Sequence, residues 1–155
     1  MIHYLKYTLL FLFLCFACKQ KEVSDAIPDK TPDPVGVTIK ILGIAQDAGF
    51  PQIQCKKTCC NGLWDDPSRR KMVASIGLTD HDAGKSWLFD ATPDIKFQLQ
   101  DLLNEENTLS GVFLSHAHIG HYTGLMHFGR EAMGTTGLPV FAMPRMYSFL
   151  SNNGP

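Results

Sequence analysis

Three histidines, His116, His118 and His121, follow directly on the apolar run Val112–Leu114. In an extended segment, residues i and i+2 point to the same side, so His116 and His118 can face one metal ion. His121 follows after a turn and can approach that ion from another direction. Neutral imidazoles bind zinc, iron and manganese, and sites in α/β proteins gather at the carboxyl ends of strands. The spacing predicts a metal site; the alternative is that all three are ordinary loop residues.

Three cysteines, Cys55, Cys59 and Cys60, form a second group of ligand types. Disulfides alone cannot consume an odd number of thiols. The adjacent pair Cys59 and Cys60 is poorly suited to a disulfide, whereas both thiols could turn toward a metal. Export would favour oxidation. Two interpretations stay open: a structural zinc ion held by the thiols, or one disulfide with a free thiol.

Alternating β-branched patterns and short apolar runs predict the elements that position these groups. Strands are expected over residues 37–45, 72–79, 87–90, 111–115 and 138–142, with a hairpin turn over 80–84. Helices are expected over 93–103, 123–133 and 144–150. Thr92 is the expected N-cap of the first helix, and Pro93 its first residue. This order of strands and helices indicates an α/β sandwich.

Composition excludes several classes of protein. The chain has 155 residues, of which 45% are hydrophobic and 19% charged, as in one globular domain. Fourteen basic and fifteen acidic residues give a formal net charge of −1. No basic field is therefore present to hold nucleic acid, and we expect no nucleic-acid partner. A fibrous protein and a multi-pass membrane protein are excluded as well.

The first part of the chain has the features of a secretory signal. Residues 1–18 combine a basic start with an apolar run that is too short to span a bilayer. Ala17-Cys18 resembles a bacterial lipoprotein cleavage site, so Cys18 is the expected site of lipidation and of membrane anchoring in the cell envelope. A plain signal peptide and an uncleaved anchor are the alternatives. Residues 19–36 are expected to form a flexible linker, which leaves 37–155 as the folded domain.

The histidine pattern also carries a family resemblance. His116-x-His118-x-x-His121 resembles the His-x-His-x-Asp-His signature of the metallo-β-lactamase fold, and Trp87–Asp90 resembles that superfamily's strand ending in Asp. The resemblance implies an αββα sandwich and runs from about Val37 to the end of the chain.

A narrower likeness lies in two loops. Gly49–Gln52, close to the cysteines, and Asp90–Asp94 are similar to the branch that contains pyrroloquinoline quinone biosynthesis protein B. That branch also resembles a cyclic phosphodiesterase of phosphonate metabolism. Its structural zinc cluster, Cys-x-Cys-x-x-Cys, matches this chain at Cys55 and Cys60. Lys57 replaces the middle cysteine, for which Cys59 could compensate. A fourth ligand, which could be His81 or an Asp, is not identified.

Carried over by position, the resemblance implies that His116 and His118 ligate a first metal and His121 a second. The signature's Asp is replaced by Gly120, which removes an anionic ligand. Asp47 could supply a substitute carboxylate, or it could be a solvated loop residue. Restoring the carboxylate by Gly120→Asp is expected to strengthen the second site. Asp90 is expected to support the histidine loop by hydrogen bonding and not to act as a base.

The resemblance further implies a His, a bridging Asp and a final His in the second half of the fold. This chain has no His after His127 and no Asp after Asp101. We therefore expect it to be the N-terminal half of the sandwich, a fragment or a truncated product. Alone, it is expected to be inactive and to expose the sheet face that the second half would cover.

The leading functional hypothesis is a metal-dependent hydrolase acting on an ester or phosphodiester, with one or two zinc ions and an unidentified small-molecule substrate. Iron or manganese would also suit the imidazoles. One alternative is an iron-dependent oxidoreductase similar to the quinone-biosynthesis branch. The other is a non-catalytic metal-binding lipoprotein that keeps the fold after losing a ligand.

Overall fold

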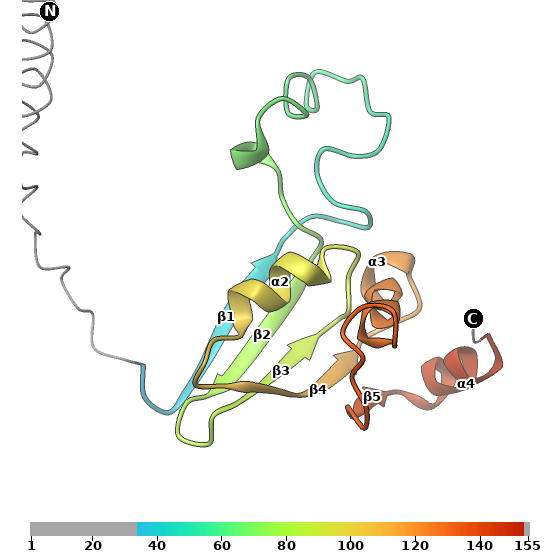
Figure 1. The fold of residues 1–155 in the computed structure, drawn as a ribbon. Coiled ribbons are helices and arrows are strands. Elements are labelled where there is room, and N and C mark those ends of the chain that lie inside the picture. The colour runs from blue at the N-terminus through green and yellow to red at the C-terminus, as the bar shows by residue number, and fades with distance from the viewer. Residues whose placement is uncertain (1–33, 154–155) are drawn as a thin grey trace, which may run out of the picture. The chain divides into compact units, whose positions relative to one another are not determined.

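A computed structural model describes residues 34–153, and the expected secretory signal with Cys18 lies outside the described residues. The strands form one sheet in the order β1-β2-β3-β4-β5 (Figure 1). They are β1 (Val37–Gly43), β2 (Ser75–Asp80), β3 (Lys85–Phe89), β4 (Thr108–Leu114) and β5 (Val140–Ala142). The α-helices are α2 (Ile95–Leu102), α3 (Ile119–Tyr122) and α4 (Pro144–Asn152), and the 3-10 helices are η1 (Pro67–Arg69) and η2 (Thr123–Phe128).

The sheet is mixed. β1–β2 and β2–β3 pair antiparallel, whereas β3–β4 and β4–β5 pair parallel. The β2–β3 hairpin closes through the expected turn, where the Asp80 carboxylate accepts a hydrogen bond from the Ala83 amide. A parallel pair needs a crossover connection, and α2 provides it between β3 and β4. The predicted α/β class is therefore confirmed.

The core lies between the sheet and α2, which crosses one sheet face in Figure 1. From the helix, Ile95, Leu99 and Leu102 are buried against strand residues that include Leu88 and Val112. These helix positions recur at the three- and four-residue spacing of one helical face. Burial of this stripe fixes α2, and with it the β3–α2 turn that begins at Asp90.

The opposite sheet face carries a row of large apolar side chains in register. Phe113 stacks between its neighbours from β3 and β5, with ring centroids 4.8 and 4.5 Å apart. Residues of the row from β1, β2 and β5 are exposed. The row consists of Ile41, Ile76, Phe89, Phe113 and Phe141. The described unit thus has the exposed apolar sheet face that the sequence led us to expect.

Two expected helices differ from the structure. The helix expected from Pro93 begins at Ile95, and Thr92 is not its N-cap. The Thr92 hydroxyl instead accepts the Asp94 amide (3.0 Å) and donates to the Gln98 side chain (2.6 Å), which makes a separate turn before the helix.

The helix expected over 123–133 is wrong. The chain forms η2 there and then turns at Gly129. The Gly124 amide donates to the Ala91 carbonyl (2.9 Å), and a Cβ at Gly124 would lie 2.2 Å from the Thr92 carbonyl oxygen. Tertiary contact with the β3–α2 turn therefore overrides the local helical pattern.

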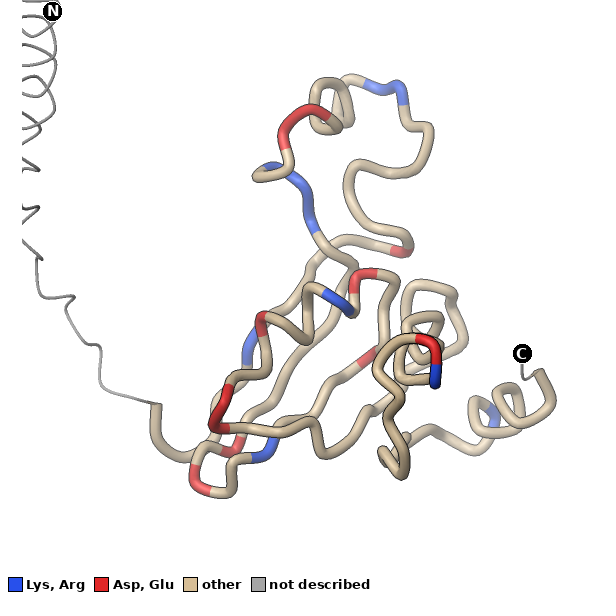
Figure 2. Tube along the Cα trace, in the orientation of Figure 1, with Lys and Arg blue, Asp and Glu red and all other residues tan. Residues whose placement is uncertain are grey.

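The segment between β1 and β2 leaves the sheet as an irregular excursion (Figure 1). Bridges from Ala45 to Val73 and from Phe50 to Lys71 hold its base. Figure 2 shows lysines, arginines and carboxylates along it, so charges of both signs alternate there. Among residues 34–153, no helix is both long enough and apolar enough to cross a membrane.

Candidate metal centre

The three histidines come together at the end of β4. His116 and His118 follow Leu114 in an extended segment, and His121 lies in α3 directly afterwards. The ring centroid of His116 is 4.6 Å from that of His118 and 4.1 Å from that of His121. The structure thus places all three predicted ligands side by side.

Asp90 holds this cluster from the end of β3. Its Oδ1 accepts the Ser115 amide (2.8 Å), and its carboxylate also accepts the Ser115 hydroxyl. Its Oδ2 lies 2.8 Å from His121 Nδ1. A carboxylate on Nδ1 fixes the tautomer that leaves the Nε2 lone pair for a metal. Ser115 Oγ in turn lies 2.9 Å from His116 Nδ1, which leaves Nε2 of His116 available.

Asp47 faces the cluster from the loop after β1. Its Oδ1 lies 3.4 Å from His121 Nε2, and its Oδ2 lies 3.7 Å from His118 Nδ1. Both ends of the loop are fixed, because the Ala45 amide donates to the Met72 carbonyl (2.9 Å) and the Phe50 amide to the Lys71 carbonyl (2.9 Å). The carboxylate is thus held opposite two imidazole nitrogens.

The donor set fits a divalent metal ion. The histidines and Asp47 line a hollow of about 570 Å³, which is open to solvent at His118. Bonds of 2.0–2.2 Å to a tetrahedral ion place its ligand atoms about 3.4 Å apart, close to the two separations from Asp47. The ligand atoms of these side chains, one from each residue, do not all lie within 4.8 Å of one another. Within residues 34–153, only the cysteine group meets that distance. Closing around an ion therefore requires these side chains to move.

The absence of a side chain at Gly120 explains why the Asp47 carboxylate can lie close to His118 and His121. A Cβ at position 120 would be 2.4 Å from Asp47 Oδ1 and 2.9 Å from its Cα. The space that a side chain at 120 would occupy is filled by the Asp47 carboxylate. The expectation that Gly120→Asp strengthens the second site stays a prediction, and the new side chain would have to displace the Asp47 carboxylate.

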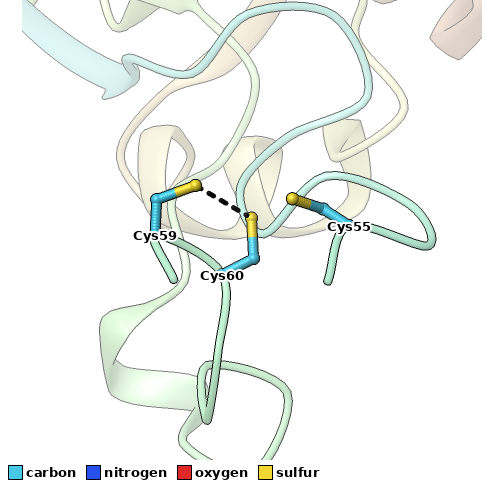
Figure 3. A group of neighbouring side chains, drawn as sticks. All are labelled: Cys55, Cys59 and Cys60. Carbon is cyan, nitrogen blue, oxygen red and sulfur yellow. Dashed lines mark hydrogen bonds between the residues drawn. The ribbon is translucent and has the colours of Figure 1, made fainter. Parts of the chain in front are cut away.

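The cysteines form a separate group on the excursion (Figure 3). Their Sγ atoms all lie within 4.8 Å of one another, and those of Cys59 and Cys60 are 3.8 Å apart, so the thiols are free in this structure. Soft thiolates at this spacing suit zinc. Within the described residues no fourth ligand joins them; His81 lies instead in the β2–β3 turn, 2.8 Å from Thr38 Oγ1.

The thiols are not equivalent. Interaction with the Cys60 thiol, aided by the Lys57 amide, lowers the pKa of Cys55. The same interaction, together with burial, raises the pKa of Cys60 to about 11. Cys55 is thus the thiol of this pair that ionises first, and a cation would have to draw the proton from Cys60.

The sequence analysis did not identify the residues that hold the base of the Asp47 loop in place. The Asp94 carboxylate accepts the Val73 amide (2.8 Å), and the buried Gln98 donates to the Val73 carbonyl (2.7 Å). Val73 in turn bridges to Ala45, at the base of the Asp47 loop. The Asp90–Asp94 motif therefore supports two parts of the hollow: Asp90 contacts His121, and Asp94 holds Val73 beside the Asp47 loop. The available signal was an Asp directly before the start of α2.

The chain is similar in sequence to proteins named for coenzyme PQQ synthesis. No family model matches the chain. Coenzyme PQQ synthesis protein B of Klebsiella pneumoniae is 33% identical over 131 residues, which cover 71% of this chain and 42% of that protein. The chain thus spans about two fifths of the length of such relatives.

Two solved structures share the fold. Zn²⁺-bound PqqB from Methylobacterium extorquens superposes with a TM-score of 0.61 and 25% identity, covering 74% of this chain and 40% of that one. A diphosphatase of the PhnP family gives a TM-score of 0.59 and 25% identity, with coverage of 75% and 45%. The chain belongs to the metallo-β-lactamase-fold superfamily, in the branch that resembles coenzyme PQQ synthesis protein B.

Proposed function

We propose that this chain carries the histidine-rich metal centre of a metal-dependent hydrolase that acts on an ester or phosphodiester. The observation that supports this most directly is the convergence of three imidazoles and one carboxylate on a solvent-open hollow. The likeness to a diphosphatase of the PhnP family favours phosphate-ester chemistry. The substrate would be a small molecule that enters from the His118 side.

In this proposal His116, His118 and His121 hold the ion, with zinc as the first choice and iron or manganese as alternatives. A bound divalent ion supplies Lewis acidity, which polarises a phosphoryl or acyl oxygen and makes water a better nucleophile near neutral pH. Asp90 keeps the Nδ1 proton of His121 in place. Ser115 links Asp90 to His116, so both imidazoles are oriented by one carboxylate.

Hydrolysis of an activated phosphodiester tests this function in a zinc- or manganese-loaded protein that joins this chain to the second half of a relative, since the chain spans about two fifths of the length of such relatives. We expect turnover that His118→Ala abolishes and that His127→Ala leaves unchanged. His127 is an exposed histidine outside the hollow, so it is a matched control. Metal uptake at the histidines without hydrolysis of any ester or phosphodiester would contradict a hydrolase and favour a metal-binding protein.

A second candidate is an iron-dependent oxidoreductase that takes part in making a quinone cofactor. The observation that favours it is the 33% identity to a protein named for coenzyme PQQ synthesis. Loading with Fe²⁺ under anaerobic conditions, followed by exposure to oxygen, separates the two candidates. Oxygen consumption that depends on a modified amino-acid substrate would favour the oxidoreductase, and its absence would favour the hydrolase.

The cysteines are proposed as a structural zinc site. The spacing of Cys55, Cys59 and Cys60 supports it, with water or a residue outside the described range as fourth ligand. Zinc there would tie the excursion together and leave the histidine hollow for chemistry.

Export and anchoring are proposed from the sequence. We expect lipid on Cys18 to anchor the protein in a bacterial cell envelope. Fractionation of cells that produce the wild-type chain or Cys18→Ala tests this. Release of the variant from membranes is the expected result, and its retention would indicate a different anchor.

A further inference from the structure

We infer that Asp47 is itself a metal ligand of the histidine centre, a role that rests on the proposed metal function. The first reason is its position. Each of its two oxygens faces a different imidazole, at 3.4 Å from His121 Nε2 and 3.7 Å from His118 Nδ1. Separations of this size are those between ligand atoms that share one ion, since bonds near 2.1 Å span about 3.4 Å across a tetrahedron.

The second reason is that the free nitrogen of His121 is aimed at Asp47 by a fixed partner. Asp90 occupies Nδ1 of His121 at 2.8 Å, and this leaves Nε2 directed toward the Asp47 carboxylate. The His121 side chain is only 16% exposed and Asp90 14%, so this arrangement is held by packing. Two carboxylates therefore flank one imidazole, and only Asp90 lies within hydrogen-bonding distance.

The third reason is that the absence of a side chain at Gly120 leaves the space that the Asp47 carboxylate occupies. A Cβ at 120 would fall 2.4 Å from Asp47 Oδ1. The Asp47 loop is pinned at Ala45 and Phe50 by backbone hydrogen bonds, so the carboxylate cannot easily withdraw. In effect the anionic ligand comes from the loop after β1 and not from the turn that carries the histidines.

Manganese is a suitable probe, because a hard ion prefers imidazole and carboxylate ligands to thiolates. We would titrate Mn²⁺ into the full chain and follow free Mn²⁺ by electron paramagnetic resonance, comparing wild type with Asp47→Asn, Asp47→Glu and His116→Ala. Asp47→Asn keeps the size of the side chain but removes its charge. Asp65→Asn, an exposed position on the excursion, is the control.

We expect Asp47→Asn to weaken Mn²⁺ binding at least about tenfold, the lower range seen when even a supporting carboxylate is lost. Asp47→Glu should recover part of the affinity, and Asp65→Asn should match wild type. Equal affinity in wild type and Asp47→Asn, with His116→Ala clearly weaker, would overturn this assignment alone and leave Asp47 as an ion-pair partner. If wild type takes up no ion that His116→Ala removes, the proposed function fails as well.

Discussion

The Nδ1 atom of His121, which lies in α3 after β4, is 2.8 Å from Oδ2 of Asp90, the residue directly after β3. The same carboxylate binds the Ser115 amide and hydroxyl. One half-buried side chain thus fixes the backbone at the strand end and the orientation of an imidazole. The geometry of the proposed centre depends on this relationship more than on any single histidine.

Replacing Asp90 by Asn should weaken metal binding without removing a ligand. The amide keeps the size of the side chain but cannot accept from Ser115 and His121 as a charged group. Loss of such a supporting carboxylate typically costs about 10- to 100-fold in metal affinity. The titration with Mn²⁺ checks this, because that ion prefers imidazole and carboxylate ligands to thiolates. Unchanged affinity, with Asp65→Asn as the control, would mean that His121 is oriented by something else.

Substitution of Gly120 by Ala should disturb the position of Asp47 in the same site. The new Cβ would meet Asp47 Oδ1 at 2.4 Å and its Cα at 2.9 Å. Overpacking of this kind costs about 1–3 kcal/mol, and it should push the Asp47 loop away and lower Mn²⁺ affinity. Urea denaturation and the resonance titration measure the two effects. Gly62→Ala is the control for Mn²⁺ affinity alone, since nothing lies within 4 Å of its Cβ but an alanine at its positive φ is strained.

The thiols should differ in reactivity toward an alkylating agent. The pKa of Cys55 is lowered and that of Cys60 is raised to about 11, so at pH 8 the thiolate fraction is larger at Cys55. We expect Cys55 to be modified well before Cys60, and zinc to protect both. Timed alkylation followed by peptide mass spectrometry gives the order. Faster modification of Cys60 than of Cys55, or no protection by zinc, would contradict the proposed thiol site.

Much of this arrangement could be predicted from sequence because it rests on local patterns. The strand before the histidines and the clustering of His116, His118 and His121 follow from a buried apolar run and period-two alternation. The helix expected over 123–133 failed because Gly124 packs on the Ala91 carbonyl, a contact between segments more than thirty positions apart in the chain. Local propensity carries no information about such a contact.

The sequence left two interpretations of Asp47 open, a substitute carboxylate and a solvated loop residue. In the sequence it is an Asp in a loop, and most such residues are solvated. Only the packing of its carboxylate against Gly120 shows that the missing side chain and the loop residue share one space. The bracing of Val73 by Asp94 and Gln98 likewise joins elements that the sequence keeps apart.

Metal content after removal of the thiols tests the central claim most directly. The full chain with Cys55→Ser, Cys59→Ser and Cys60→Ser would be reconstituted with zinc, checked for folding by circular dichroism and analysed for bound metal. The unmodified chain titrated with Mn²⁺ covers the case in which the serine variant does not fold. We predict that bound zinc persists in the serine variant, is lost when His116→Ala and His118→Ala are added to it, and stays unchanged when His127→Ala is added instead. The opposite result, in which the folded serine variant and the unmodified chain hold no ion that depends on His116 and His118, would contradict the metal centre.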